Sequence, residues 1–513
     1  MNVLYNRLFV FGLIVISAVI CSMNSWFIFF PGKAALYFVF LSIPFLFLPE
    51  FRYRAVFSAS AIFAGSVIFF ILFYPVRNIS LGDGELLYEN FLLENSVWGY
   101  QLVLDEIFEA VLHSSVFQIL KLSDPSEAYR ILSTGAGLVL VLFLFFRADQ
   151  KDRYSLLPIL TSGGMLLFFG YMENYTLTAL IIFLYAFTAL HFLDRNLMNE
   201  RNFLFLCLIS ALSFVFHMIS GYLLFSLLCL LFHCMQKRRI PFLVLKAAVL
   251  GSLIISVCIL YFILFSDLRI DFTVAHVTNP RFYPMKDFFS LNHFYEIVSC
   301  IFMTSLPSVS VTVYFIFFRR EEWKSFYTSS QGRFLLFLLL GFLIHASVHN
   351  PQLGFPRDWD LMSFYWIPFS LIAYRLLLHS VIQRSELFPV FIFSLCILLS
   401  QGYYLNIQKN EDTEKLTFLR NSVSEFSAGF QSVKASVPPK ERKFFTRASF
   451  FLFRTEKKLL TSEGREREKL LEKNSELKSL LSEYSGSWDR NLKIRFIRSA
   501  TEFHHQYLQF VRP

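Results

Sequence analysis

Long apolar runs recur along this chain up to about Tyr404, and they constrain the fold more than any other feature. A helix needs roughly 20 mostly apolar residues to cross the hydrocarbon core of a bilayer. Composition agrees, because 55% of the 513 residues are hydrophobic, 17% are charged, and mean hydropathy is +0.52. A soluble protein carries about 25% charged residues. The sequence therefore predicts an all-α polytopic membrane protein.

We expect about thirteen transmembrane helices, the first of them an uncleaved N-terminal span because no small-x-small cleavage site follows it. The predicted ranges are 8–30, 34–49, 55–75, 130–147, 155–172, 176–193, 202–217, 219–235, 241–265, 294–318, 333–349, 363–379 and 387–404. The ranges 202–217 and 219–235 are both short, so their division into two spans stays open. Residues 1–54 form a two-span N-terminal segment.

Orientation follows from the short loops that concentrate Lys and Arg, which stay on the cytoplasmic side. Those loops include 52–54, 237–239 and 319–324, so the N-terminus is predicted to be cytoplasmic in a cytoplasmic membrane. The opposite set of connections is predicted to face outward. It comprises 77–129, 172–175, 217–221, 266–293 and 345–361.

The tail, residues 405–513, differs in character from the rest of the chain. From Gln408 onward it holds 21 Lys and Arg against 14 Asp and Glu, about +7 of the chain's net +9. Leucines recur at helical spacing within Thr461–Tyr484. An odd number of spans would place this basic, soluble α-helical domain outside. Its charged faces are either simply solvated or lie on anionic headgroups or polymer.

An acidic motif, Gly82-Asp83-Gly84-Glu85, opens the first long outer loop. The flanking glycines allow a tight turn that presents the Asp83 carboxylate without crowding. A carboxylate beside the membrane can accept a proton from a substrate hydroxyl, so Asp83 and Glu85 are candidate catalytic residues. The alternatives are an ordinary solvated turn, or the later pair Asp105-Glu106 in the catalytic role.

Two further outer segments carry candidate residues. Glu173 lies at the end of the fifth predicted span with no adjacent cation, which makes it a third catalytic candidate. Before the tenth span, Arg281 and Tyr283 lie among prolines. This stiff arginine can hold a substrate phosphate or anchor a lipid headgroup.

The richest polar segment is 345–361, between two apolar runs. His345 and His349 are one helical turn apart, and Arg357 can bind phosphate through two parallel hydrogen bonds. Asp358 and Asp360 can hold a divalent cation, Mg²⁺ or Mn²⁺, that grips phosphate oxygens. The alternative is an Arg–Asp pair in a structured loop beside two satisfied histidines.

The rest of the chain narrows the possible chemistry. Lys246, Glu296 and Arg333 all lie near span ends, whereas ion-coupled transporters usually bury ionisable residues along their path. The seven cysteines fall inside apolar runs, so we expect neither a disulfide framework nor a thiolate metal site. The expected partners are membrane lipid and a lipid-linked substrate, with no nucleic acid.

Many spans, an acidic motif in a large outer loop, later outer loops with Arg and His, and a C-terminal outer domain together resemble the GT-C glycosyltransferases. The resemblance covers most of 55–404 and implies a transmembrane catalytic region whose outer loop, 76–129, carries interfacial helices. It implies a polyprenyl-phosphate-linked sugar as donor, with Asp83 as base in an inverting transfer. Arg357, with Arg281 or a cation on Asp358 and Asp360, would neutralise the departing phosphate. One departure is that the acidic loop follows the third span here, but the first span in the family.

Three other functions remain open. An outer-face polysaccharide polymerase or ligase would rely on Arg357 and His349 without needing Asp83. A lipid or glycan transporter would use the polar outer loops as a vestibule. A membrane anchor would present the helical tail to a partner.

Overall fold

The computed structural model divides the chain into two compact units, which are described separately. Unit 1 comprises 1–84, 105–258 and 283–412, and unit 2 comprises 85–104, 259–282 and 413–513. The structure describes residues 2–23, 33–47, 53–77, 82, 84–93, 107–148, 152–235, 246–247, 250–251, 282–351, 358–379, 386–407, 417, 420–428, 437–438, 441–461 and 464–503.

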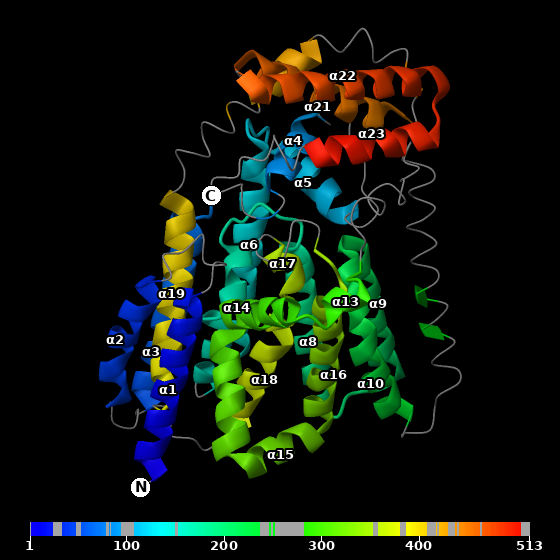
Figure 1. Cartoon of the computed structure of the whole chain (residues 1–513). Coiled ribbons are helices and arrows are strands. Elements are labelled where there is room, and N and C mark those ends of the chain that lie inside the picture. Colours follow the sequence, from blue (N-terminus) through cyan, green and yellow to red (C-terminus); the bar gives the residue numbers. More distant parts are fainter. Residues whose placement is uncertain are drawn as a thin grey trace. The chain divides into compact units, whose positions relative to one another are not determined.

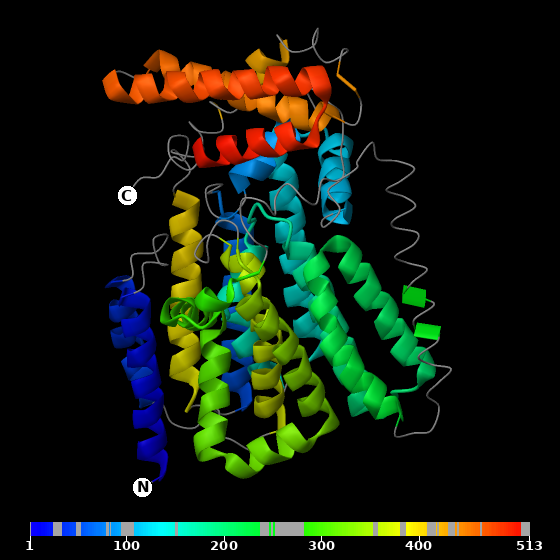
Figure 2. The same ribbon diagram turned by 45° about the vertical axis from the view of Figure 1, so that its right-hand side comes forward.

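Unit 1 is a bundle of helices (Figures 1 and 2). Its α-helices are α1 (Asn2–Met23), α2 (Lys33–Leu46), α3 (Tyr53–Phe73), α5 (Ile107–Ile119), α6 (Pro125–Arg147), α7 (Leu157–Leu160), α8 (Thr176–Asp194), α9 (Glu200–Phe216), α10 (Leu224–Met235), α13 (Met285–Phe288), α14 (Leu291–Phe318), α15 (Arg320–Thr328), α16 (Ser330–Val348), α17 (Trp359–Met362), α18 (Trp366–His379) and α19 (Phe388–Ile407). Three short 3-10 helices lie within the described residues: η3 (Arg153–Leu156), η4 (Gly163–Phe168) and η5 (Met218–Leu223).

Side-chain caps account for several helix starts. Asp124 accepts a hydrogen bond from Ser126 N at 2.8 Å, and Pro125 follows as the first residue of α6. Ser290 caps α14 and Ser329 caps α16 in the same way, through the backbone N–H three residues on. Each cap satisfies a backbone donor that the first helical turn leaves free.

Six helical segments in the described part of the chain are long and apolar enough to cross a membrane. They are 125–147, 176–194, 218–235, 291–318, 330–348 and 388–407, and shorter apolar helices lie within α1, α2, α3 and α18. The prediction of an all-α polytopic membrane protein agrees with this architecture. The count of thirteen stays a prediction, because most of the range 241–265 lies outside the described residues.

The predicted span 155–172 is wrong as a continuous helix. The segment runs through η3, one turn of α7 and η4, with a break at Thr161 and Ser162. Its ends nevertheless lie at opposite ends of α6. The Arg153 guanidinium stacks on Phe145 near the end of α6, while Leu167 O accepts a hydrogen bond from Ser133 Oγ at 2.8 Å near its start. The segment is therefore a broken crossing that runs antiparallel to α6.

Local contacts explain the break. Ser162 Oγ donates to the carbonyl of Thr304 on α14, and the Cα of Gly163 lies so close to the Met303 carbonyl that a Cβ would overlap it. Pro307 removes an N–H donor from the facing part of α14, and a small cavity lies beside the break. Every residue from Tyr154 to Thr176 is buried, which is the condition under which non-helical backbone is tolerated at membrane depth.

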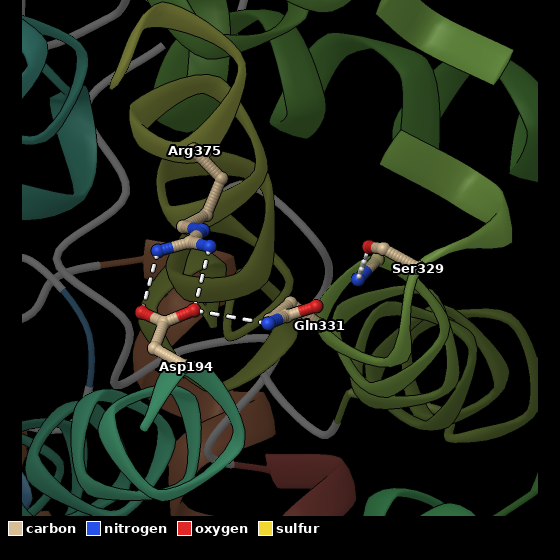
Figure 3. A network of polar contacts seen from close by, with 5 residues as sticks. Asp194, Ser329, Gln331 and Arg375 are labelled. Atoms are coloured by element: carbon tan, nitrogen blue, oxygen red, sulfur yellow. Dashed lines mark hydrogen bonds and ion pairs between the residues drawn. The ribbon is translucent and has the colours of Figure 1, made fainter. Parts of the chain in front are cut away.

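A polar network joins three helices of unit 1 (Figure 3). The two terminal guanidinium nitrogens of Arg375 on α18 donate to the Asp194 carboxylate at the end of α8, each at 2.7 Å. Gln331 on α16 donates to the same carboxylate at 3.0 Å. The Arg375 side chain is 7% exposed and the Asp194 side chain 33% exposed. This network links the helices α8, α16 and α18 to one another.

Unit 2 contains α4 (Gly84–Leu93, apart from its first residue), α21 (Arg442–Thr461), α22 (Gly464–Ser487) and α23 (Arg490–Phe503). Its three C-terminal helices enclose a core that includes Leu477, Leu481, Tyr484 and Phe496. The Tyr484 hydroxyl donates to Glu441, and the Tyr88 hydroxyl of α4 accepts a 2.6 Å hydrogen bond from Arg420. The domain boundaries predicted from composition stay a prediction.

Candidate functional site

The acidic turn of the first long loop lies against the segment that carries Glu173. Gly82 adopts a positive φ of 65°, and a Cβ on it would overlap the Glu173 carboxylate and lie 2.6 Å from the Tyr171 hydroxyl. Only glycine suits this backbone conformation and this close approach. Asp83 lies outside the described residues, and the side chain of Glu85, in α4, is not described.

Backbone contacts present Tyr171 and Glu173 at this point. Gly170, at a φ of 84°, donates its N–H to Ser133 Oγ at 3.0 Å, and a Cβ on it would lie 2.8 Å from Pro75. Val76 N donates to Phe169 O at 2.5 Å. The end of the broken crossing is therefore held between α6 and the chain that leaves α3. Both of its polar side chains are buried, Tyr171 at 0% and Glu173 at 2% exposed.

The Asp-x-Asp end of segment 345–361 meets the same point. The ring of Trp359 lies 5.8 Å from that of Tyr171, and Asp360 Oδ1 accepts the Leu361 N–H at 2.8 Å. The Tyr171 phenol lies within electrostatic reach of both the Asp360 and the Glu173 carboxylates. Two carboxylates from distant parts of the sequence therefore act on one hydroxyl.

Histidines line the neighbouring part of the bundle. The rings of His345 and His349 stack with centroids 5.1 Å apart, although α16 ends at Val348 and His349 is the extended residue that follows it. His345 also contacts the ring of Tyr222 at 5.0 Å. His217, whose Nδ1 accepts the Ile219 N–H at 3.1 Å, packs edge-on against Tyr175 at 4.9 Å. Tyr175 follows Glu173 by two residues, so these rings continue the same site.

Tyr283 closes another side of this region. Its ring centroid lies 4.0 Å from that of His293, and its N–H donates to Val348 O at 3.1 Å, next to His349. Burial raises the pKa of Tyr283, and the nearby charges of Glu296, Asp287 and Asp358 add to that effect. Tyr283 and Asp358 therefore lie within electrostatic reach of each other.

Of the predicted residues, Glu173, Asp358, Asp360, His345, His349 and Tyr283 lie in the described structure, whereas Asp83, Arg281 and Arg357 lie outside it. We call the group around Tyr171, Glu173 and Asp360 the acidic site. The contacts of Gly82 join the acidic turn to it. Within the described residues, no group of three or more His, Cys, Asp or Glu side chains is arranged to hold a metal ion. A divalent cation on Asp358 and Asp360 stays a prediction.

Tyr171 and His217 were not among the predicted site residues. Tyr171 had the pattern of an interfacial aromatic residue, and His217 that of a connection between two spans. One usable signal is that Tyr171 precedes Glu173 by two residues in a segment with glycine before it. Extended chain places such side chains on one side.

Comparison with known proteins gives one similar structure. No protein-family model matches the chain, and no curated protein matches it. Among solved structures, the crystal structure of ArnT from Cupriavidus metallidurans bound to undecaprenyl phosphate is similar to it at 10% sequence identity. The match covers 89% of this chain and 81% of that chain, with a TM-score of 0.38.

Proposed function

We propose that this chain is a membrane glycosyltransferase that moves a sugar from a polyprenyl-phosphate carrier to an acceptor hydroxyl. The observation that carries the proposal is the contact of Gly82 with Glu173 and Tyr171. This contact brings the neighbour of Asp83 to the acidic site that Asp360 also joins. The support for the proposal is that Asp83 directly follows Gly82 in the sequence, and that Arg357 directly precedes Asp358.

The proposed reaction proceeds with inversion at the anomeric carbon. Asp83 takes the proton of the acceptor hydroxyl as the hydroxyl oxygen forms a bond to the anomeric carbon. The bond between that carbon and the carrier phosphate oxygen breaks, and the electron pair leaves with the phosphate. Arg357, with Arg281 or a cation on Asp358 and Asp360, neutralises that charge. One such pre-placed group typically contributes roughly 3 kcal/mol of transition-state stabilisation.

Glu173 holds the acidic turn in this proposal and does not itself take the proton. Its carboxylate lies against the Gly82 backbone, a contact that a glutamine side chain can largely keep. We therefore expect Glu173→Gln to retain most of the transfer rate, with an unchanged pH profile, and Glu173→Ala to lose much more. Equal, complete loss in both variants would instead assign Glu173 to the proton transfer.

The decisive experiment is Asp83→Asn, measured with purified protein and a polyprenyl-phosphate sugar in proteoliposomes. The expected result is a loss of transfer of at least 1,000-fold, while Asp105→Asn and Glu106→Gln stay active. Full activity in Asp83→Asn would exclude it as the base and favour a polymerase or ligase that relies on Arg357. Movement of the lipid-linked sugar across the vesicle without a new glycosidic bond would favour a transporter. The anomeric configuration of the product, read by NMR, tests inversion.

A further inference from the structure

Large apolar side chains are exposed at the start of α14 and in the short segment that precedes it in unit 1. Met285 in the one-turn helix α13 and Phe289 in the turn after it are each 75% exposed. Leu291 and Phe294, in the first turn of α14, are 87% and 66% exposed. Contiguous exposed apolar surface of this kind marks an interaction site.

The opposite side of the same segment is polar and faces the candidate site. His293 is buried and its Nε2 lies 2.8 Å from Ser347 O, while its Nδ1 lies 3.8 Å from the Glu296 carboxylate. The Tyr283 ring packs on His293. Helical periodicity separates the two sides, because Leu291, Phe294 and Tyr295 share a face that His293 does not.

The helix changes direction after this segment. Pro307 lies inside α14 and removes one backbone donor, which kinks a helix at the preceding turn. In Figure 1 the first turns of α14, beside α13, run across the long axis of its remaining turns. The helix as a whole, 291–318, is long and apolar enough to cross a membrane. The exposed apolar face is thus continuous with a surface that meets lipid.

We infer that residues 285–295 form a membrane-contact segment, which we call the lip. It lies in the bilayer leaflet on the side of the candidate site and contacts the hydrocarbon chains of the lipids in that leaflet. Lys286, exposed in the same stretch, lies where it can meet lipid phosphate headgroups. The polar underside of the lip, with His293 and Tyr283, forms a lateral wall of the candidate site. One short segment therefore separates that site from the bilayer.

A photo-crosslinking experiment tests this contact without any measurement of glycosyl transfer. Benzoylphenylalanine replaces Leu291 or Phe294, one at a time, in the full chain reconstituted in phosphatidylcholine and phosphatidylglycerol nanodiscs. Two controls come from the same chain. Phe146, 78% exposed on the membrane-spanning α6, reports lipid contact, and Lys478, 54% exposed on α22 of unit 2, reports exposure outside the bundle.

We expect irradiation to give covalent lipid adducts by mass spectrometry at positions 291 and 294, with yields within about twofold of those at position 146. Adducts at the level of position 478 would overturn the inference. So would a crosslinked species of twice the chain mass, which would mean that a second copy covers this face. Because the experiment measures lipid contact and not glycosyl transfer, the lip can be disproved while the proposed transferase activity is confirmed. Equally, the lip can be confirmed while the transferase activity is disproved.

Discussion

Removal of either partner of the Asp194–Arg375 pair should destabilise the protein by unequal amounts. Asp194→Ala leaves a guanidinium that is only 7% exposed without its two charged hydrogen bonds. Loss of one partner of a buried ion pair lowers the free energy of unfolding by about 3–5 kcal/mol. We expect a loss of about 3 kcal/mol for Asp194→Ala, because the Asp194 side chain is one-third exposed. Arg375→Met leaves a carboxylate that keeps access to water and the Gln331 amide. We therefore expect only about 1–2 kcal/mol for that change.

Equilibrium unfolding in mixed micelles, followed by tryptophan fluorescence, measures both changes and the double variant. The coupling free energy of the pair should be about 2 kcal/mol, which the double-mutant cycle isolates. The exposed pair Lys246–Glu200, at 2.7 Å with side chains 44% and 28% exposed, is the matched control. Its coupling should not exceed about 0.5 kcal/mol. Equal losses in the two single variants, or a coupling no larger than the control, would refute the argument from burial.

Three further predictions follow from single contacts. Gly82→Ala should lower transfer activity about 100-fold by displacing the acidic turn. Gly135→Ala is the control, because a Cβ at Gly135 would have no neighbouring atom within 4 Å, and it should leave activity unchanged. Equal activities of the two variants would contradict this prediction. Gly163→Ala should lower the free energy of unfolding by about 2 kcal/mol, because a Cβ would meet the Met303 backbone; a stability equal to that of Gly135→Ala would disprove the close approach. Burial lowers the pKa of His113 from 6.5 to about 4, so the fold favours the neutral ring. The resulting stabilisation of the fold is complete above pH 6.5 and declines as the pH falls toward 4. The free energy of unfolding should therefore fall by about 2 kcal/mol between pH 7 and pH 5. His113→Gln should remove this loss, as measured by unfolding titrations at the two pH values.

Apolar periodicity predicted most of the membrane-spanning helices because burial in lipid leaves a clear signal in the sequence. It failed at 155–172, where the residues are as apolar as in a span but the backbone is not a continuous helix. Propensity alone does not reveal this break, since Ser162 and Gly163 take their conformation from contacts with α14, more than 100 residues away. Tertiary contacts decided the local structure there.

The candidate site was predictable in its residue types and only partly in its arrangement. The spacing of His345 and His349 predicted that their rings lie close together, but not that α16 ends at Val348, between them. The meeting of Gly82 with Glu173 could not be predicted, since it depends on how the broken crossing lies against α6. The positive φ of Gly82 is visible in the sequence only as a glycine next to an aspartate.

Two polar groups in the described part of unit 1 differ in their balance of charge, and that difference bears on function. Asp194 and Arg375 are of opposite sign and satisfy each other through two short hydrogen bonds, as a structural clamp requires. Around Tyr171, the carboxylates of Glu173 and Asp360 come from distant parts of the sequence and lie near one phenol. The Asp194–Arg375 pair therefore balances its own charge, whereas the acidic site gathers two carboxylates, one of them against Gly82, the residue that precedes the proposed base Asp83.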